Sequence, residues 1–198
     1  MTTTTGLRTF GPHEVGWKLH VRAPVPKHVE NSLHGTRYAA RHGYDTTDLD
    51  MLPDAVLTER AKDPAPMTFA EIVGHLRNTH WEDPFRHDGF RDPKHILGKG
   101  DLVTEMHPYE LDRLVAGHWP GRRFHIPRIE DQLALCGELE RQALLEPKRS
   151  RVWLRQEVWN YLAAMADWHG TRTAVYSLMH ECLPYARQAG FRAWPIAA

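Results

Sequence analysis

Residues 30–50 read ENSLHGTRYAARHGYDTTDLD, and they carry the clearest indication of the fold class. Apolar residues recur at helical spacing over residues 31–42, and Gly43 is typical of the residue that follows a helix C-terminus. The segment Asp45–Asp50 that comes next is predicted to be a strand. A helix that leads directly into a strand is the repeating unit of α/β sheets, so the stretch predicts an α/β fold.

Two acids lie in this strand. Asp48 and Asp50 are two residues apart, so their side chains point to the same face. Neighbouring carboxylates repel each other unless a cation or a proton lies between them. The pair is therefore a candidate site for a divalent metal ion. The alternative is chance, since an Asp-x-Asp sequence in a turn is only solvated.

The charge and composition exclude several classes of protein. The 198 residues include 25 basic and 25 acidic side chains, so no net field attracts nucleic acid or an anionic membrane. No run of about 18 apolar residues occurs, as a membrane span would require, and the polar N-terminus does not resemble a signal peptide. Cys136 and Cys182 lack metal-ligand spacing and are expected to be buried, reduced thiols. We expect a cytoplasmic protein with a flexible segment over residues 1–14 and one domain over residues 15–198.

Strand and helix patterns alternate along the rest of the chain. This alternation predicts a parallel sheet wound by right-handed crossovers, with the site at the carboxyl ends of the strands. About six strands are recognisable, which is too few for a complete eight-stranded barrel. Residues 53–66 are expected to be a surface insertion and residues 83–100 a long excursion. Strands are expected at 17–22, 45–50, 143–148, 173–178 and 191–196, and helices at 31–42, 107–115, 129–141, 152–169 and 182–189. Residues 69–79 are ambiguous: their start is helical in composition, but 72–80 could supply the third strand.

Other reactive side chains fall at the ends of these elements. Glu146 and Lys148 end the fourth strand, His80 the third and Arg22 the first, and Glu30 precedes the first helix. A third carboxylate would complete an oxygen site for Mg²⁺ or Ca²⁺. Basic side chains bind phosphate, and an imidazole transfers a proton near neutral pH. Together these groups indicate phosphodiester cleavage.

Each of these residues also has a purely structural interpretation. His80 could be packed in the core beside Trp81. Glu146 and Lys148 could form a surface ion pair at a turn.

The order of the motifs resembles that of the glycerophosphodiester phosphodiesterase family, a metal-dependent group on a TIM-barrel fold. The likeness covers roughly residues 18–148. Its motifs are Glu30-Asn31-Ser32 for the family's Glu-Asn-Thr, Gly43-Tyr44-Asp45 for Gly-Ala-Asp, Asp48-Leu49-Asp50 for Glu-x-Asp, Ile126-Pro127-Arg128-Ile129-Glu130 for Ile-Pro-Thr-Leu-Glu, and Glu146-Pro147-Lys148 for Glu-x-Lys.

The resemblance implies a fold and an activity. The fold is α/β and TIM-barrel-like, here as a short or incomplete barrel. The activity is hydrolysis of a glycerophosphodiester to glycerol phosphate and an alcohol. Asp48, Asp50 and Glu146 would hold Mg²⁺ or Ca²⁺, while Lys148 and Glu30 would bind the substrate.

The resemblance also assigns catalytic roles. Arg22 aligns with the family's arginine and His80 with its second histidine. This register places Val21 where the first catalytic histidine stands in the family. His20 is one residue away from that position, and His28 lies in the following loop, so both are candidates to replace it.

Two further functions stay open. Val21 favours a degenerate member that binds a phosphodiester or a metal without turnover. A structural or interaction protein is the third reading, in which the seven tryptophans simply fill the core. The expected partner is a small-molecule phosphodiester. The exposed edge of an incomplete barrel would also favour pairing between copies of the chain, as a homo-oligomer.

Overall fold

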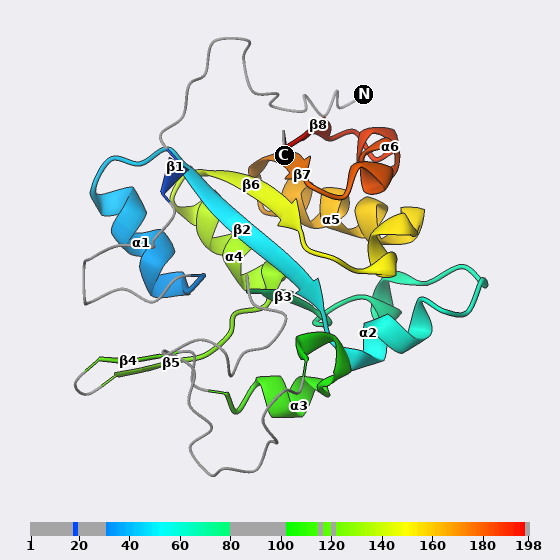
Figure 1. Cartoon of the computed structure of the whole chain (residues 1–198). Coiled ribbons are helices and arrows are strands. Elements are labelled where there is room, and N and C mark those ends of the chain that lie inside the picture. The colour runs from blue at the N-terminus through cyan, green and yellow to red at the C-terminus, as the bar shows by residue number, and fades with distance from the viewer. Residues whose placement is uncertain (1–17, 20–30, 80–101, 115–116, 120–121, 197–198) are drawn as a thin grey trace.

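The computed structural model describes residues 18–19, 31–79, 102–114, 117–119 and 122–196. Its centre is a sheet with five parallel strands in the order β1-β2-β6-β7-β8 (Figure 1). A sixth strand, β3, pairs antiparallel with β2. The α/β class and the six strands expected from the sequence are confirmed. The strands are β1 (Lys18–Leu19), β2 (Thr46–Pro53), β3 (Leu76–Asn78), β6 (Gln142–Pro147), β7 (Arg172–Ser177) and β8 (Arg192–Pro195).

The helix expected before β2 is α1 (Leu33–Arg41). It begins at Ser32, whose hydroxyl accepts a hydrogen bond from the Gly35 amide and so satisfies one of the helix's free N–H groups. Gly43, just beyond its end, has a φ of +78°, a conformation that glycine adopts without strain. The local signals in this stretch therefore predict the observed helix and strand.

The later helices also follow the expected pattern, with one division. The long apolar stripe predicted over residues 152–169 is split at Arg155, whose φ of −106° and ψ of 117° are extended. Its guanidinium donates to the carbonyl oxygens of Ala61 and Ala65 and so fastens a neighbouring loop. The helical segments are α4 (Ile129–Glu138), η4 (Arg151–Leu154), α5 (Gln156–Trp168), η5 (His180–Cys182) and α6 (Leu183–Gln188).

The structure differs from the expectation in the region after β2. The sheet is not wholly parallel, because the chain leaves β2, forms only short helical segments and returns beside the same strand as β3. Part of the stretch expected as an insertion is helical, and Leu57 within it is fully buried. A two-stranded ribbon was not predicted, since its strands have three residues each. These segments are α2 (Ala55–Arg60), η1 (Phe69–Glu71), η3 (Val103–Glu105), α3 (Pro108–Leu111), β4 (Gly117–Trp119) and β5 (Arg122–Phe124).

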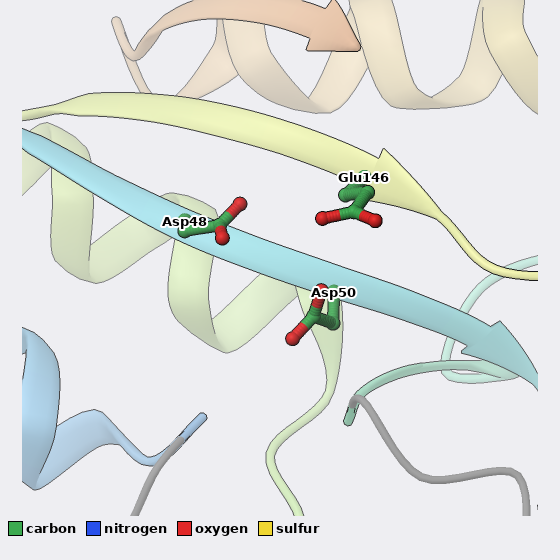
Figure 2. A group of neighbouring side chains, drawn as sticks. All are labelled: Asp48, Asp50 and Glu146. Carbon is green, nitrogen blue, oxygen red and sulfur yellow. The ribbon is translucent and has the colours of Figure 1, made fainter. Parts of the chain in front are cut away.

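The two faces of the sheet are covered differently. Helices α4 and α5 lie against one face (Figure 1). The acidic side chains of β2 and β6 project from the opposite face (Figure 2). Residues 1–14 and 83–100, for which we expected a flexible segment and a long excursion, lie outside the described residues. Among the helices that are described, none is both long and apolar enough to cross a membrane.

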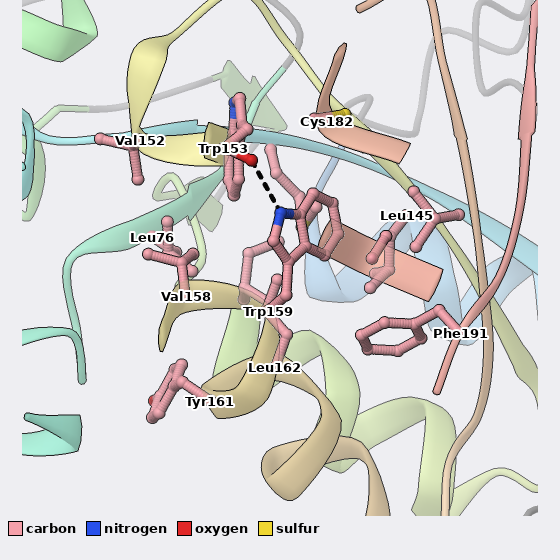
Figure 3. Close-up of a cluster of buried hydrophobic side chains, with 14 of the residues drawn as sticks. Leu76, Leu145, Val152, Trp153, Val158, Trp159, Tyr161, Leu162, Cys182 and Phe191 are labelled. Carbon is pink, nitrogen blue, oxygen red and sulfur yellow. Dashed lines mark hydrogen bonds between the residues drawn. The ribbon is translucent and has the colours of Figure 1, made fainter. Parts of the chain in front are cut away.

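The main core lies between the sheet and these helices (Figure 3). Trp153 and Trp159 are fully buried there, and the Trp159 indole donates to the Trp153 carbonyl at 2.8 Å. Both cysteines are buried and unbridged, as predicted. Trp168 and Trp194 are 82% and 41% exposed, so the tryptophans do not all serve as core.

Candidate functional site

Three carboxylates converge on the face of the sheet opposite α4 (Figure 2). Asp50 of β2 is in register with Glu146 of β6, and Asp48 lies two residues before Asp50 on the same face. One oxygen from each carboxylate lies within 4.8 Å of the others. All three side chains are buried, with exposures of 7% for Asp48, 1% for Asp50 and 7% for Glu146. The structure thus brings together the three residues predicted as metal ligands.

Lys148 lies on one side of this group. Its Nζ is 2.7 Å from Asp50 Oδ1 and also forms an ion pair with Glu146 Oε1. Burial alone would lower the pKa of Lys148, but the charges and hydrogen bonds of the two carboxylates outweigh it and raise that pKa. The ammonium group is therefore fully charged at neutral pH, where it partly offsets the repulsion between the acids.

Tyr176 of β7 lies on another side, and its hydroxyl donates to Asp48 Oδ1 at 2.7 Å. Burial is the main cause that raises the pKa of Tyr176, followed by the charge of Asp48 and a hydrogen bond to Glu146. The phenol consequently stays protonated and acts as a donor. No motif in the sequence indicated this residue. The register of β6 with β7 places Tyr176 on the strand next to Glu146. This position can be inferred only when the order of the strands is known.

Two asparagines connect the site to the surrounding loops. Asn31 Nδ2 donates to Asp50 Oδ2 at 2.9 Å. Asn78 Nδ2 donates to the Asp50 carbonyl at 2.9 Å, and its own Oδ1 accepts from Gln132 of α4. Asn31 has a φ of +54°, a conformation that asparagine tolerates better than most residues. The unusual backbone at Asn31 thus accompanies a direct contact with the acid pair.

The remaining predicted residues lie outside the part of the chain that the structure describes. These are His80, Arg22, His20 and Glu30, with Val21 and His28. Two described neighbours of these residues do contact Asp50, one at its side chain and one at its backbone. Asn31 follows Glu30 in sequence, and the Thr79 amide, next to His80, donates to the Asp50 carbonyl at 3.0 Å. The catalytic and substrate-binding roles of the residues outside the description stay predictions.

The donor set fits a hard divalent cation. The three side chains offer only carboxylate oxygens, the ligands that Mg²⁺ and Ca²⁺ prefer, and no sulfur or imidazole nitrogen. The oxygens are close enough for a single ion to contact all three. Asp48, Asp50 and Glu146 could therefore hold one ion near the point where the parallel pairing of β2 with β6 ends, at Met51 and Pro147. The sequence predicts the acid pair at the end of its strand, but the pair lies within β2, because β2 continues to Pro53. Catalytic sites lie at the carboxyl ends of the strands in parallel α/β folds.

No protein-family model matches the sequence, and no curated protein matches it. Solved structures do match. The first is assigned as a glycerophosphoryl diester phosphodiesterase from Silicibacter pomeroyi DSS-3, with 19% identity, a TM-score of 0.64, and coverage of 85% of this chain and 60% of that one. A second is the glycerophosphodiester phosphodiesterase of Agrobacterium tumefaciens str. C58, with 20% identity, a TM-score of 0.58, and coverage of 83% and 60%.

A third match is an Oleispira antarctica phosphodiesterase in complex with its product sn-glycerol-3-phosphate. It shares 17% identity at a TM-score of 0.60, over 84% of this chain and 59% of that one.

This chain has the fold of the glycerophosphodiester phosphodiesterases. The fold implied by the sequence motifs is thereby confirmed. The chain spans about three fifths of the length of these phosphodiesterases, with 60%, 60% and 59% of the three structures covered. The five parallel strands of the described residues are likewise fewer than the eight of a closed TIM barrel, so an incomplete barrel fits both observations.

Proposed function

We propose that this protein is a metal-dependent phosphodiesterase. It would hydrolyse a glycerophosphodiester-type substrate to glycerol phosphate and an alcohol. The observation that carries the proposal is the buried group of three carboxylates, Asp48, Asp50 and Glu146, beside the cation of Lys148. It is supported by the fold shared with phosphodiesterases, one of which was solved with sn-glycerol-3-phosphate.

The roles of the described residues follow from their charges. Asp48, Asp50 and Glu146 would hold Mg²⁺ or Ca²⁺. That ion would neutralise charge on the phosphoryl oxygens. Lys148 is poised next to the same carboxylates, so its ammonium group can bind a further phosphoryl oxygen. The pairing of Lys148 with two carboxylates also holds its long side chain at the site.

The roles of the remaining residues rest on the resemblance of motifs. Arg22 and Glu30 would bind the substrate's phosphate and hydroxyl groups. His80 would donate a proton to the alkoxide oxygen as the bond between phosphorus and that oxygen breaks. His20 or His28 would take the place of the family's first histidine, where this chain carries Val21.

The direct test is hydrolysis of glycerophosphocholine and of bis(p-nitrophenyl) phosphate with Mg²⁺, with Ca²⁺ and with EDTA. We expect product only when a metal is present. Glu146→Gln should remove this activity, because the amide withdraws one of the three anionic ligands. Glu138→Gln is the matched control, since Glu138 is an exposed carboxylate on α4. Activity that persists in EDTA would contradict the metal-dependent mechanism.

Val21 motivates a second candidate, a protein that binds a phosphodiester or a metal without turnover. Calorimetric titration with glycerol 3-phosphate, with and without Mg²⁺, distinguishes the two candidates. Metal-dependent binding together with no hydrolysis of either substrate would favour the binding protein. Metal-dependent release of product would exclude it.

His80 provides the sharpest test of the proposed chemistry. His80→Ala should lower turnover at least about a hundredfold, on the scale of a lost acid–base group. His42→Ala is the control, because His42 is exposed at the end of α1. Near-normal turnover in His80→Ala would remove this residue from the mechanism.

A further inference from the structure

Tyr176 links strands that are not neighbours in the sheet. It lies on β7, and its hydroxyl donates to Asp48 on β2 at 2.7 Å. Strand β6 lies between these two strands. Adjacent strands are about 4.8 Å apart, so the side chains of Tyr176 and Asp48 together bridge about 10 Å across the sheet. The long side chain of Tyr176 provides most of this distance.

The same hydroxyl also interacts with Glu146, on the strand that it crosses. It therefore contacts two of the three carboxylates of the site. Lys148 contacts the other pair, Asp50 and Glu146. Tyr176 and Lys148 thus approach the three acids from different sides and share Glu146 as an acceptor, while Asn31 also donates to Asp50.

We propose that Tyr176 is the positioning residue of the metal site, holding Asp48 and Glu146 with their oxygens directed at one ion. This inference rests on the proposed function, because it assigns an ion to the three carboxylates. An aspartate side chain rotates about two bonds, and a hydrogen bond to Oδ1 fixes the plane of the carboxylate. Donors that orient ligands in this way are part of most metal sites, and their loss weakens metal affinity.

The geometry separates this role from simple packing. Tyr176 is only 8% exposed, and an apolar ring would fill the same space. A phenylalanine would do so without the donor, leaving two buried carboxylates to repel each other more strongly. The hydroxyl, rather than the ring, is therefore the part of Tyr176 that bears on the metal.

The test compares Tyr176→Phe with Tyr161→Phe. Tyr161 is a matched control, since it is also buried and its hydroxyl also donates to a carboxylate, that of Glu130, away from the three acids. Mg²⁺ and Mn²⁺ are titrated calorimetrically into each protein, with no substrate present. We expect Tyr176→Phe to weaken metal binding by about 10–100-fold and Tyr161→Phe to leave it unchanged.

A second measurement separates positioning from damage to the fold. The metal concentration that gives half-maximal hydrolysis should rise in Tyr176→Phe by the same factor as the dissociation constant. Turnover at saturating metal should return close to the wild-type value. If Tyr176→Phe does not fold, Tyr176→Met is titrated instead, because its flexible apolar side chain fills the space without a donor; weakened binding is again expected.

The outcomes are distinct. If the wild type binds metal and the Tyr176 variant binds it equally well, the positioning role is overturned and the proposed function stands. An equal loss of metal affinity in Tyr161→Phe would also overturn the positioning role, because it would indicate a general effect on stability. If the wild type binds no metal, the proposed function fails, and the role of Tyr176 fails with it.

Discussion

The two faces of β2 and β6 are both largely buried, but they are chemically opposite. Leu49 and Leu145 point toward the helices and are 0% exposed, within the main apolar core. Asp50 and Glu146, one residue further along each strand, point the other way at 1% and 7% exposure. The apolar face stabilises the fold by removing hydrocarbon from water. Burying the carboxylates of the acidic face costs desolvation energy. Their presence is therefore explained by the binding of a ligand rather than by a contribution to stability.

The apolar face nonetheless supports the acidic one. The Trp153 indole, fully buried in the core, donates to the Lys148 carbonyl at 2.6 Å. Lys148 in turn pairs with Asp50 and Glu146 on the other face. The backbone at the end of β6 is therefore fixed from the core side, while its side chains serve the site. This connection explains how a packed core can position a charged group that it does not touch.

The largest effect that we expect separates the two faces directly. Leu145→Ala should lower the free energy of unfolding by about 2–5 kcal/mol, through lost burial and a cavity. Glu146→Gln should change it by less than about 1 kcal/mol, because relief of repulsion offsets the weakened pairing with Lys148. Both values come from urea denaturation in EDTA. A larger loss in Glu146→Gln than in Leu145→Ala would show that the acidic face stabilises the fold.

The next effect concerns the metal. At a concentration about 100 times its dissociation constant, Mg²⁺ or Ca²⁺ should raise the free energy of unfolding by about 2.7 kcal/mol, since it binds only the folded state. Asp50→Asn should abolish this gain. Leu49→Met, a change of similar volume on the apolar face, should keep it. Thermal or urea denaturation of the two variants, with and without metal, measures this gain. If the metal stabilises both variants, the ion binds at another site.

The smallest effect concerns a buried charge with a partly exposed partner. Arg77 on β3 is 0% exposed, and its guanidinium pairs with Asp112 at 2.6 Å. Burial would raise the pKa of Asp112, but Arg77 and Arg128 outweigh it and lower that pKa. Stability from this carboxylate is therefore present above its ordinary pKa, about 3.9, and lost as the pH falls through its lower folded-state pKa.

Asp112→Asn should accordingly cost about 1–2 kcal/mol at pH 7, a modest value because Asp112 is half-exposed. The cost should shrink toward zero in strong acid, where the wild-type carboxyl is also neutral. Urea denaturation across the acid range measures this. If the loss of stability in Asp112→Asn did not vary with pH, it would arise from the changed shape of the side chain rather than from the lost charge.

Much of the fold could be predicted because its signals are local. The cap at Ser32, the turn at Gly43 and the apolar stripe of α5 lie within single elements. A strand was predicted at the place of β3, but its antiparallel pairing with β2 was not. The β4–β5 ribbon was missed, since strands of three residues carry too little pattern. Of the site, the three acids and Lys148 were found from strand-end positions and motif order. Tyr176 was not, because its role depends on which strands are neighbours.

That Asp48 and Asp50 share a face follows from their spacing alone, because side chains alternate along any strand. The periodicity of apolar residues likewise indicates the order of helices and strands. Only the tertiary structure decided that Glu146 meets Asp50 and that Tyr176 reaches Asp48. Those contacts depend on strand order and register, which are set by packing between segments far apart in the chain.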